Sequence, residues 1–271
     1  MRTVYMLSLW LVALTMSAQE VKLLSFNIRY DNSGDGIDQW SERKTDVLHL
    51  LDSSEATVIG LQEALYSQVQ FLDSLMPELT FIGVGRDDGD KGGELSPIFY
   101  DSTRLALMDF GTFWLSPTPN KVSKGWDAAL PRVCTFAIFK EAKTEKIFWV
   151  YNTHFDHMGK TARLSSAAII VQHMYKNNIS KSPVILMGDL NALPNSRPLE
   201  LLSNHFEDPL NESTAGTFWG FNPEAKAENR IDYIMGKGIE FTDSRILFNR
   251  RPNGRHISDH LPVFALFSFE E

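Results

Sequence analysis

The chain has 271 residues, of which 43% are hydrophobic, and its formal net charge at neutral pH is −8. That length and apolar content suffice for one large core, and no long linker, like-charge block or exact repeat divides the sequence, so we expect a single domain over residues 19–271. The acidic total argues against a protein that attracts long polyanions through its overall field, and a phosphorylated ligand would need a local cation and selected Arg or Lys residues.

Residues 1–18 have the pattern of a secretory signal peptide. Arg2 supplies the positive end, residues 4–14 the apolar middle, and Ser17 and Ala18 small residues before a cleavage point at Gln19. The apolar run is well short of the ~20 residues that a membrane span needs. Met16 departs from the preferred small residue at its position, which leaves the exact cut open. We expect an exported protein, periplasmic or extracellular, without a membrane anchor.

The rest of the chain mixes strands and helices. Apolar runs bounded by turn residues predict strands over 21–28, 57–61, 80–84, 96–100, 105–110, 133–140, 146–153, 184–187, 231–235, 239–248 and 261–269. Helices are predicted over 41–51, with Ser41 as N-cap, and over 67–75, 159–177 and 198–202. Several neighbouring strands have no helix between them. This favours an α+β or layered sandwich architecture, with antiparallel sheets packed together and helices outside.

Two features between these elements need a separate interpretation. The long loop over 115–131 lacks periodicity, which is often a sign of function, and it carries Trp126 in an exposed-looking position. Cys134 is the only cysteine, so no intramolecular disulfide forms. Its apolar neighbours predict a packed core residue rather than a nucleophile.

Strand after strand ends in an acid, an amide or an imidazole. If the strands share a sheet edge, all of these side chains open onto one rim, and jointly they are hard to explain as turn residues. The clearest case is the apolar strand that ends at Gly188, where alternation places Asp189 and Asn191 on one face. The full set is Asn27, Glu63, His154, Asp189 with Asn191, Asp232, and Asp259 with His260.

These residues support a specific chemistry. Glu63 and Asp259, with Asn27 or Asp189 nearby, offer hard oxygen ligands and no thiolate, which favours Mg²⁺ or Mn²⁺ over zinc. A hard cation, two imidazoles and a carboxylate base are the parts of metal-assisted phosphoester hydrolysis. In that reaction Asp189 would orient or deprotonate water, while imidazolium and Asn191 would donate to the developing negative charge.

Six ordered segments resemble the motifs of the endonuclease/exonuclease/phosphatase superfamily, which has the deoxyribonuclease-like fold. The resemblance runs from about Val21 to Phe269, and six motifs in sequence order are far more specific than one. It implies a four-layer α/β sandwich of two packed mixed sheets flanked by helices, with the site at one end. The segments are Leu24–Arg29, Gly60–Glu63, Asn152–His157, Gly188–Ala192, Arg230–Ile234 and Ser258–Val263.

The resemblance also implies roles for the metal and water ligands. Glu63 would be the principal metal ligand, with Asn27 and Asp259 beside it. Asp189 would activate the attacking water, and Asn191 would hold that water or the phosphate.

The remaining implied roles concern the substrate phosphate. His260, supported by Asp232, would contact the scissile phosphate, and His154 would be a second phosphate-contacting imidazole. Glu94 matches a position where some members pair a carboxylate with that histidine, although loop polarity explains it equally well. Arg132 matches a phosphate-binding arginine, with a strand-end surface charge as the alternative.

Residues outside these motifs carry weaker signals. Trp126 on its loop is a candidate to stack a base or sugar, as are Trp114, Trp219 and Phe221, although aromatics more often pack under a loop. Residues 86–90 lack the spaced ligands of a calcium loop and predict a flexible acidic turn. Asp156 and His157 fit a solvated pair as well as a supporting role.

We therefore expect a secreted, Mg²⁺- or Mn²⁺-dependent monomeric phosphoesterase. Its substrate would be a nucleic-acid end or a small phosphoester, and residues 111–116 and 124–127 look most like exported bacterial members grouped with deadenylase-type exonucleases. No apolar hairpin of the kind expected in a membrane-docking sphingomyelinase is evident. A non-catalytic exported binding protein would have lost at least one of the principal side chains, and none is missing. A glycoside hydrolase would not need two histidines.

Overall fold

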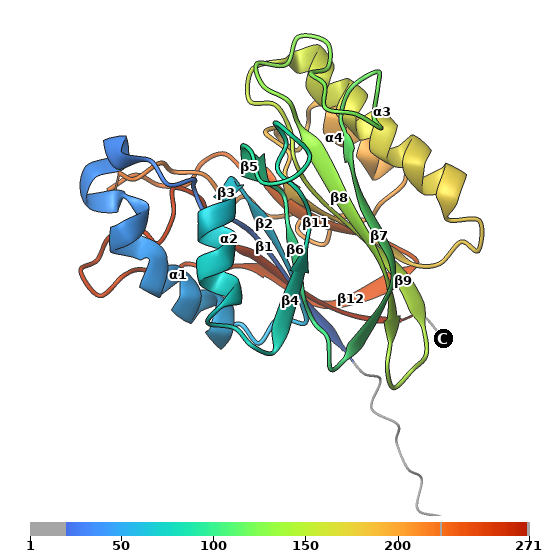
Figure 1. Cartoon of the computed structure of the whole chain (residues 1–271), viewed down its shortest axis with the longest axis horizontal. Helices are drawn as coiled ribbons and strands as arrows, with labels where there is room; N and C mark the ends of the chain where they lie inside the picture. The colour runs from blue at the N-terminus through green and yellow to red at the C-terminus, as the bar shows by residue number, and fades with distance from the viewer. Residues whose placement is uncertain (1–19, 223, 270–271) are drawn as a thin grey trace, which may run out of the picture.

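The computed structural model describes residues 20–222 and 224–269, so the expected signal peptide lies outside the described residues. Two mixed β-sheets pack against each other, and helices cover the outer face of each (Figure 1). This confirms the predicted four-layer α/β sandwich. No helix of the described part of the chain is long and apolar enough to cross a membrane.

Each large sheet contains one parallel pair of strands, and all its other neighbours are antiparallel. The six-stranded sheet has the order β12 (Ile239–Ile246), β13 (Val263–Phe269), β1 (Val21–Asn27), β2 (Val58–Gln62), β6 (Ile98–Asp101) and β4 (Leu79–Ile82). The five-stranded sheet has the order β11 (Asp232–Lys237), β10 (Val184–Asp189), β9 (Ile147–His154), β8 (Val133–Glu141) and β7 (Leu105–Trp114). The short strands β3 (Ala64–Leu65) and β5 (Glu94–Leu95) pair separately.

The helices form the two outer layers. Apolar stripes place α1 (Trp40–Ser53) and α2 (Tyr66–Asp73) against the six-stranded sheet, and α3 (Lys160–Asn177) and α4 (Arg197–Ser203) against the five-stranded sheet (Figure 1). A short 3₁₀ segment, η1 (Ser33–Asp38), precedes α1. The predicted cap at Ser41 is wrong, because α1 already begins at Trp40 and Gln39 occupies the N-cap position.

The predicted end of the strand that begins at Leu105 is also wrong. Strand β7 continues through Gly111 to Trp114, whose side chain is buried rather than placed on a loop. Gly111 interrupts the apolar pattern, but a Cβ at this position would lie 2.8 Å from the ring of Phe136, so the strand needs a glycine there. The prediction that Cys134 is a packed core residue is confirmed, since its side chain is fully buried.

A buried amide joins the two sheets close to one end of the sandwich. Asn152 of β9 donates hydrogen bonds to the carbonyl oxygens of Leu61 and Pro97, both at 2.8 Å, and accepts one from Gln62 at 2.7 Å. The sheets approach so closely here that a Cβ on Gly60 would lie 2.5 Å from the sulfur of Met187. These cross-sheet bonds hold the ends of β2 and β9 at a fixed separation.

Replacement of this amide should be costly. We expect Asn152→Leu to lower the free energy of unfolding by about 2–4 kcal/mol, because three buried groups each lose one hydrogen bond. Urea denaturation followed by circular dichroism measures the change. The matched control is Asn204→Leu, whose exposed amide bonds only the carbonyl of Glu200. A loss no larger than that of the control would show that the sheets are held together without the Asn152 bonds.

Candidate active site

The topology brings the expected polar residues to one end of the sandwich. The two parallel pairs, β1 with β2 and β9 with β10, end on the same side, and the antiparallel strands β11 and β13 begin there. In the five-stranded sheet Asp189 is directly paired with His154 on one side and with Asp232 on the other. The common rim that the strand-end pattern predicted is therefore present in the structure.

Asp189 lies at the centre of this rim. Its carboxylate, 1% exposed, accepts hydrogen bonds from the amide of Asn27 at 3.0 Å and from the backbone N–H of Asn191 at 2.9 Å. The Nε2 atoms of His154 and His260 lie 3.5 and 3.7 Å from the same carboxylate oxygen. A carboxylate flanked by two imidazoles at the mouth of a hollow is well placed to bind and orient a water molecule.

A buried carboxylate fixes the ring of His260. Asp232, the first residue of β11, contacts Nδ1 of His260 at 2.9 Å, which leaves Nε2 directed toward Asp189. Burial opposes a positive charge on this ring, but the neighbouring carboxylates of Asp232 and Asp189 outweigh it and raise the pKa of His260 well above its usual value. The ring is therefore an imidazolium, a hydrogen-bond donor, at neutral pH.

The pKa of His154 shifts in the opposite direction. Burial, reinforced by the nearby cations of Arg132 and Arg86, lowers the pKa of His154 well below its usual value, so this ring is neutral. Its Nε2 lies 3.1 Å from the amide of Asn191, whose left-handed backbone (φ 45°) turns the chain sharply after β10. The two histidines thus carry different charges, because His260 hydrogen-bonds the carboxylate of Asp232 whereas two guanidinium groups lie near His154.

The same neighbours shift the pKa of Asp189. Burial and, next in size, the nearby carboxylate of Asp232 raise the pKa of Asp189 to about 7, although the positive charge of His260 opposes this rise. A carboxylate with a pKa close to neutrality exchanges protons readily with water at the pH where most enzymes work.

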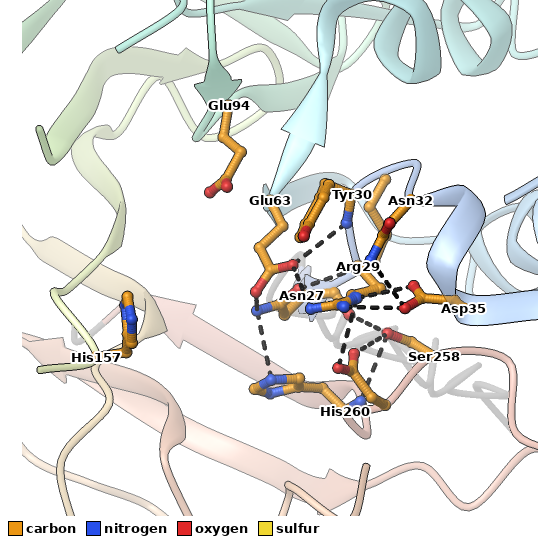
Figure 2. Close-up of polar contacts among 12 residues, drawn as sticks. Asn27, Arg29, Tyr30, Asn32, Asp35, Glu63, Glu94, His157, Ser258 and His260 are labelled. Atoms are coloured by element: carbon orange, nitrogen blue, oxygen red, sulfur yellow. Dashed lines mark hydrogen bonds and ion pairs between the residues drawn. The ribbon is translucent and has the colours of Figure 1, made fainter. Parts of the chain in front are cut away.

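Glu63 and Asn27, seen in Figure 2, form an oxygen-rich cluster beside this group together with Asp259. Glu63 has a left-handed backbone (φ 58°) between β2 and β3, and its carboxylate accepts a bond from the amide of Asn27 at 3.2 Å. Glu63 and Asp259 face the same guanidinium, that of Arg29, with N–O separations of 3.8 and 3.9 Å. Two carboxylates beside one guanidinium supply the hard oxygen donors that Mg²⁺ or Mn²⁺ prefers.

A second acidic group overlaps with this rim. Ligand atoms of Asp189, Asp232 and His260 lie within 4.8 Å of one another and could also hold a metal. This set includes an imidazole that is already bonded to Asp232, whereas Mg²⁺ prefers oxygen ligands. Glu63, Asp259 and Asn27 therefore fit Mg²⁺ or Mn²⁺ better.

Glu94 lies across the hollow from this cluster, as Figure 2 shows. Its carboxylate is 3.7 Å from Nδ1 of His154, without a hydrogen bond, and instead accepts two bonds from Arg86 at 2.6 and 2.9 Å. Burial raises the pKa of Glu94, although the charge of Arg86 opposes the rise. The sequence predicts a flexible acidic turn over residues 86–90, but the side chain of Arg86 is buried in the wall of the site.

Arg132 lies in the same wall and is held by its neighbours. Asp156 contacts its Nε at 3.4 Å, its Nη2 donates to His157 at 3.0 Å, and its Nη1 is buried without a hydrogen-bond partner among the described residues. Burial opposes ionisation of Asp156, but backbone N–H bonds led by that of Gly159 outweigh it and lower the pKa of this carboxyl to about 2. Asp156 is therefore a buried anchor for Arg132 rather than a solvated residue.

The aromatic residues that the sequence offers for stacking mostly pack against the protein. Trp114 donates its indole N–H to the carbonyl of Arg86, and the Trp219 ring lies 3.4 Å from that of His256, centroid to centroid. Trp126 is 41% exposed but does not line the hollow, so its role in substrate binding stays a prediction. Phe218, which belongs to none of the sequence motifs, does line the hollow, and its ring centroid lies 4.9 Å from that of His260.

The site opens into one hollow of about 580 Å³, large enough for a small organic molecule. Carboxylates and the two buried guanidinium groups of Arg86 and Arg132 both line it. The lining residues include Tyr30, Glu63, Arg86, Glu94, Leu130, Arg132, His154, His157, Asp189, Asn191, Phe218, Asp259 and His260.

The charge of His260 is open to a direct test. In metal-free protein we expect Asp232→Asn to lower the pKa of His260, because burial still disfavours the cation while the largest favourable charge is gone. An NMR titration of the ring resonances measures this pKa. Asp208→Asn is the control, since Asp208 pairs with Arg230 at 2.7 Å and contacts neither histidine. An unchanged His260 pKa in Asp232→Asn would contradict the assignment of its charge to Asp232.

Comparison with known proteins agrees with this architecture. The model of the Endonuclease/Exonuclease/phosphatase family matches residues 24–260. A solved protein of that family from Bacteroides thetaiotaomicron is 31% identical, with a TM-score of 0.88, and the match covers 94% of this chain and 99% of that one.

Two further solved structures differ in their sequence identity to this chain. A mannosyl-6-phosphatase of B. thetaiotaomicron is 32% identical over 92% of this chain and 100% of its own, with a TM-score of 0.87. The catalytic domain of human nocturnin is 17% identical over 93% of this chain and 94% of its own, with a TM-score of 0.74, which shows a shared fold alone. Since the family model spans most of the sequence and the structural likeness covers nearly all of it, this chain belongs to the endonuclease/exonuclease/phosphatase family.

Proposed function

We propose that this protein is an exported, divalent-metal-dependent hydrolase that cleaves the phosphomonoester of a small polar molecule such as a sugar, with water as the nucleophile. The observation that carries the proposal is the meeting of Asp189, both imidazoles and the Glu63–Asp259 pair around one hollow. A non-catalytic binding protein would not need to keep this set of titratable side chains intact.

Glu63, Asp259 and Asn27 would hold the metal. Their oxygens are hard donors, and the two carboxylates already face a shared cation. A bound Mg²⁺ or Mn²⁺ would supply Lewis acidity to a phosphoryl oxygen and neutralise charge that develops on it.

Side chains of the rim would activate the water and stabilise the charge that develops on the phosphoryl group. Asp189, with a pKa near neutrality, would orient water and accept its proton. His260, as an imidazolium fixed by Asp232, would donate to a phosphoryl oxygen that gains negative charge. Nδ2 of Asn191 bonds the Phe155 carbonyl at 3.0 Å and lies 3.1 Å from Nε2 of His154, so both its N–H bonds are engaged and its Oδ1 would hold the water.

The basic wall supports a phosphomonoester rather than a diester. A terminal phosphate carries close to two negative charges, and Arg132 presents a buried Nη1 without a partner. Arg86 lies beside it, although Glu94 engages two of its nitrogens. The relative that acts on a mannosyl 6-phosphate, at 32% identity over nearly the whole chain, supports the same substrate class.

Two further parts of the proposal rest on the sequence. Export follows from the pattern of residues 1–18, which lie outside the described structure. The net charge of −8 makes a long nucleic acid an unfavourable ligand overall and leaves small phosphoesters, which a single metal and two arginines can attract.

An assay of the mature protein with Mg²⁺ or Mn²⁺ tests this proposal. We expect sugar 6-phosphates and 4-nitrophenyl phosphate to be cleaved with kcat/KM about tenfold or more above that for bis-4-nitrophenyl phosphate, single-stranded DNA or RNA, and phospholipid vesicles, because the basic wall favours the dianion. EDTA should abolish the activity. Preferred cleavage of the diester or of nucleic acid would overturn the substrate class, and no turnover of any phosphoester would overturn the hydrolase.

The same assay includes Asp189→Asn. This variant should lose about 10²–10⁴-fold in kcat while it keeps its fold, because the amide cannot accept the proton of water. Asp109→Asn, an exposed carboxyl on β7, is the matched control and should retain activity. Full turnover in Asp189→Asn would remove Asp189 from the mechanism.

A further inference from the structure

Arg29 brings a positive charge into the cluster that is expected to hold the metal. Its guanidinium lies 3.8 Å from a carboxylate oxygen of Glu63 and 3.9 Å from one of Asp259. Figure 2 shows this side chain between Glu63 and Asp35. No role for Arg29 follows from the hydrolytic chemistry described above.

The position of the guanidinium is fixed by a strong partner. Asp35 of η1 accepts two hydrogen bonds from Arg29, both at 3.0 Å, and is itself bonded by the amide of Asn32 at 3.1 Å. The guanidinium also lies over the ring of Tyr30, 4.5 Å from its centroid. A bidentate pair of this kind holds the guanidinium plane in one orientation, so the charge does not simply swing into solvent.

The backbone of Arg29 is held as firmly. Its φ of 58° is left-handed, a conformation that a long side chain rarely adopts. Its N–H donates to the Oδ1 of Asn27 at 3.0 Å, and its carbonyl accepts from Gln68 at 3.0 Å and from Arg43 at 3.3 Å. The chain therefore maintains an unfavourable backbone conformation that aims this cation at the carboxylates.

This arrangement has opposite consequences for the metal-free and the metal-bound protein. Without a metal, Glu63 and Asp259 would repel each other in a site with little access to water, and the guanidinium between them offsets that repulsion. A divalent ion held by the same carboxylates would be repelled by the guanidinium. Because Asp35 keeps the guanidinium in place, this repulsion persists after the metal has bound.

We propose that Arg29 is a positioning residue that acts as a resident cation of the metal site: it holds Glu63 and Asp259 in place without a metal and weakens the binding of the divalent ion. The surplus positive charge would be neutralised when the substrate phosphate arrives, so metal and phosphate would strengthen each other's binding. This inference rests on the proposed metal site at Glu63 and Asp259 and assigns a control of its affinity to a residue outside the ligand set.

The test is a calorimetric titration of the mature protein with Mn²⁺ for the wild type, Arg29→Gln and Arg29→Lys. We expect Arg29→Gln to bind Mn²⁺ about tenfold more tightly, because a like charge close to the ion has been removed. Arg29→Lys keeps the charge and should stay close to the wild type. In EDTA, Arg29→Gln should melt at a lower temperature than the wild type, and added Mn²⁺ should raise its Tm by more.

Lys22→Gln is the matched control. It removes the same charge from the opposite end of β1, where Lys22 pairs with Glu55 at 2.6 Å, and should leave Mn²⁺ affinity unchanged. If Arg29→Gln does not fold, Arg29→Asn replaces it, since Asn tolerates a left-handed backbone.

The outcomes separate this inference from the proposed function. If the wild type is active and binds Mn²⁺, and Arg29→Gln binds Mn²⁺ no more tightly than the wild type, then the role of Arg29 is overturned and the proposed function is not. Equal tightening in Arg29→Gln and Arg29→Lys overturns it as well, because charge would not be the cause. A wild type that binds no Mn²⁺ overturns the metal site itself, and the inference with it.

Discussion

Burial of the Asp189 carboxylate beside that of Asp232 is the constraint on which the rest of the site depends. Both side chains are almost completely removed from water, and taking a single carboxylate out of water costs several kcal/mol after relaxation. The protein offsets this cost with an imidazolium between them, His260, and with the amide of Asn27. His260, which makes these buried charges tolerable, is also the hydrogen-bond donor that the proposed phosphoester reaction needs.

The sandwich supplies the geometry for this arrangement through its two parallel strand pairs. The ends of β1 and β2 deliver Asn27 and Glu63, and those of β9 and β10 deliver His154 and Asp189. Asn152 and Gln62 join these ends across the sheets with hydrogen bonds buried in the core. Because β1, β2, β9 and β10 each pair with a strand on both sides, little freedom remains in the positions of the side chains at their ends.

The strand-end residues could be predicted from the sequence, because strand alternation and abrupt ends of apolar runs are local signals. The helix of residues 160–177 was found for the same reason. Arg86 and Asp156 could not be assigned, since their roles depend on partners 8 and 24 residues away whose contacts only the packed fold creates. The cap at Ser41 failed because the preceding Trp40 packs into the core and extends the helix by one residue.

The location of the metal is the central claim and is directly measurable. A crystal structure of the mature protein soaked with Mn²⁺, with anomalous scattering to locate the ion, would decide between the two acidic groups of the rim. We expect the anomalous peak between the carboxylates of Glu63 and Asp259, within coordination distance of both. A peak enclosed instead by Asp189, Asp232 and His260, or no peak at this end of the sandwich, would contradict the assignment of the metal and of the reaction built around it.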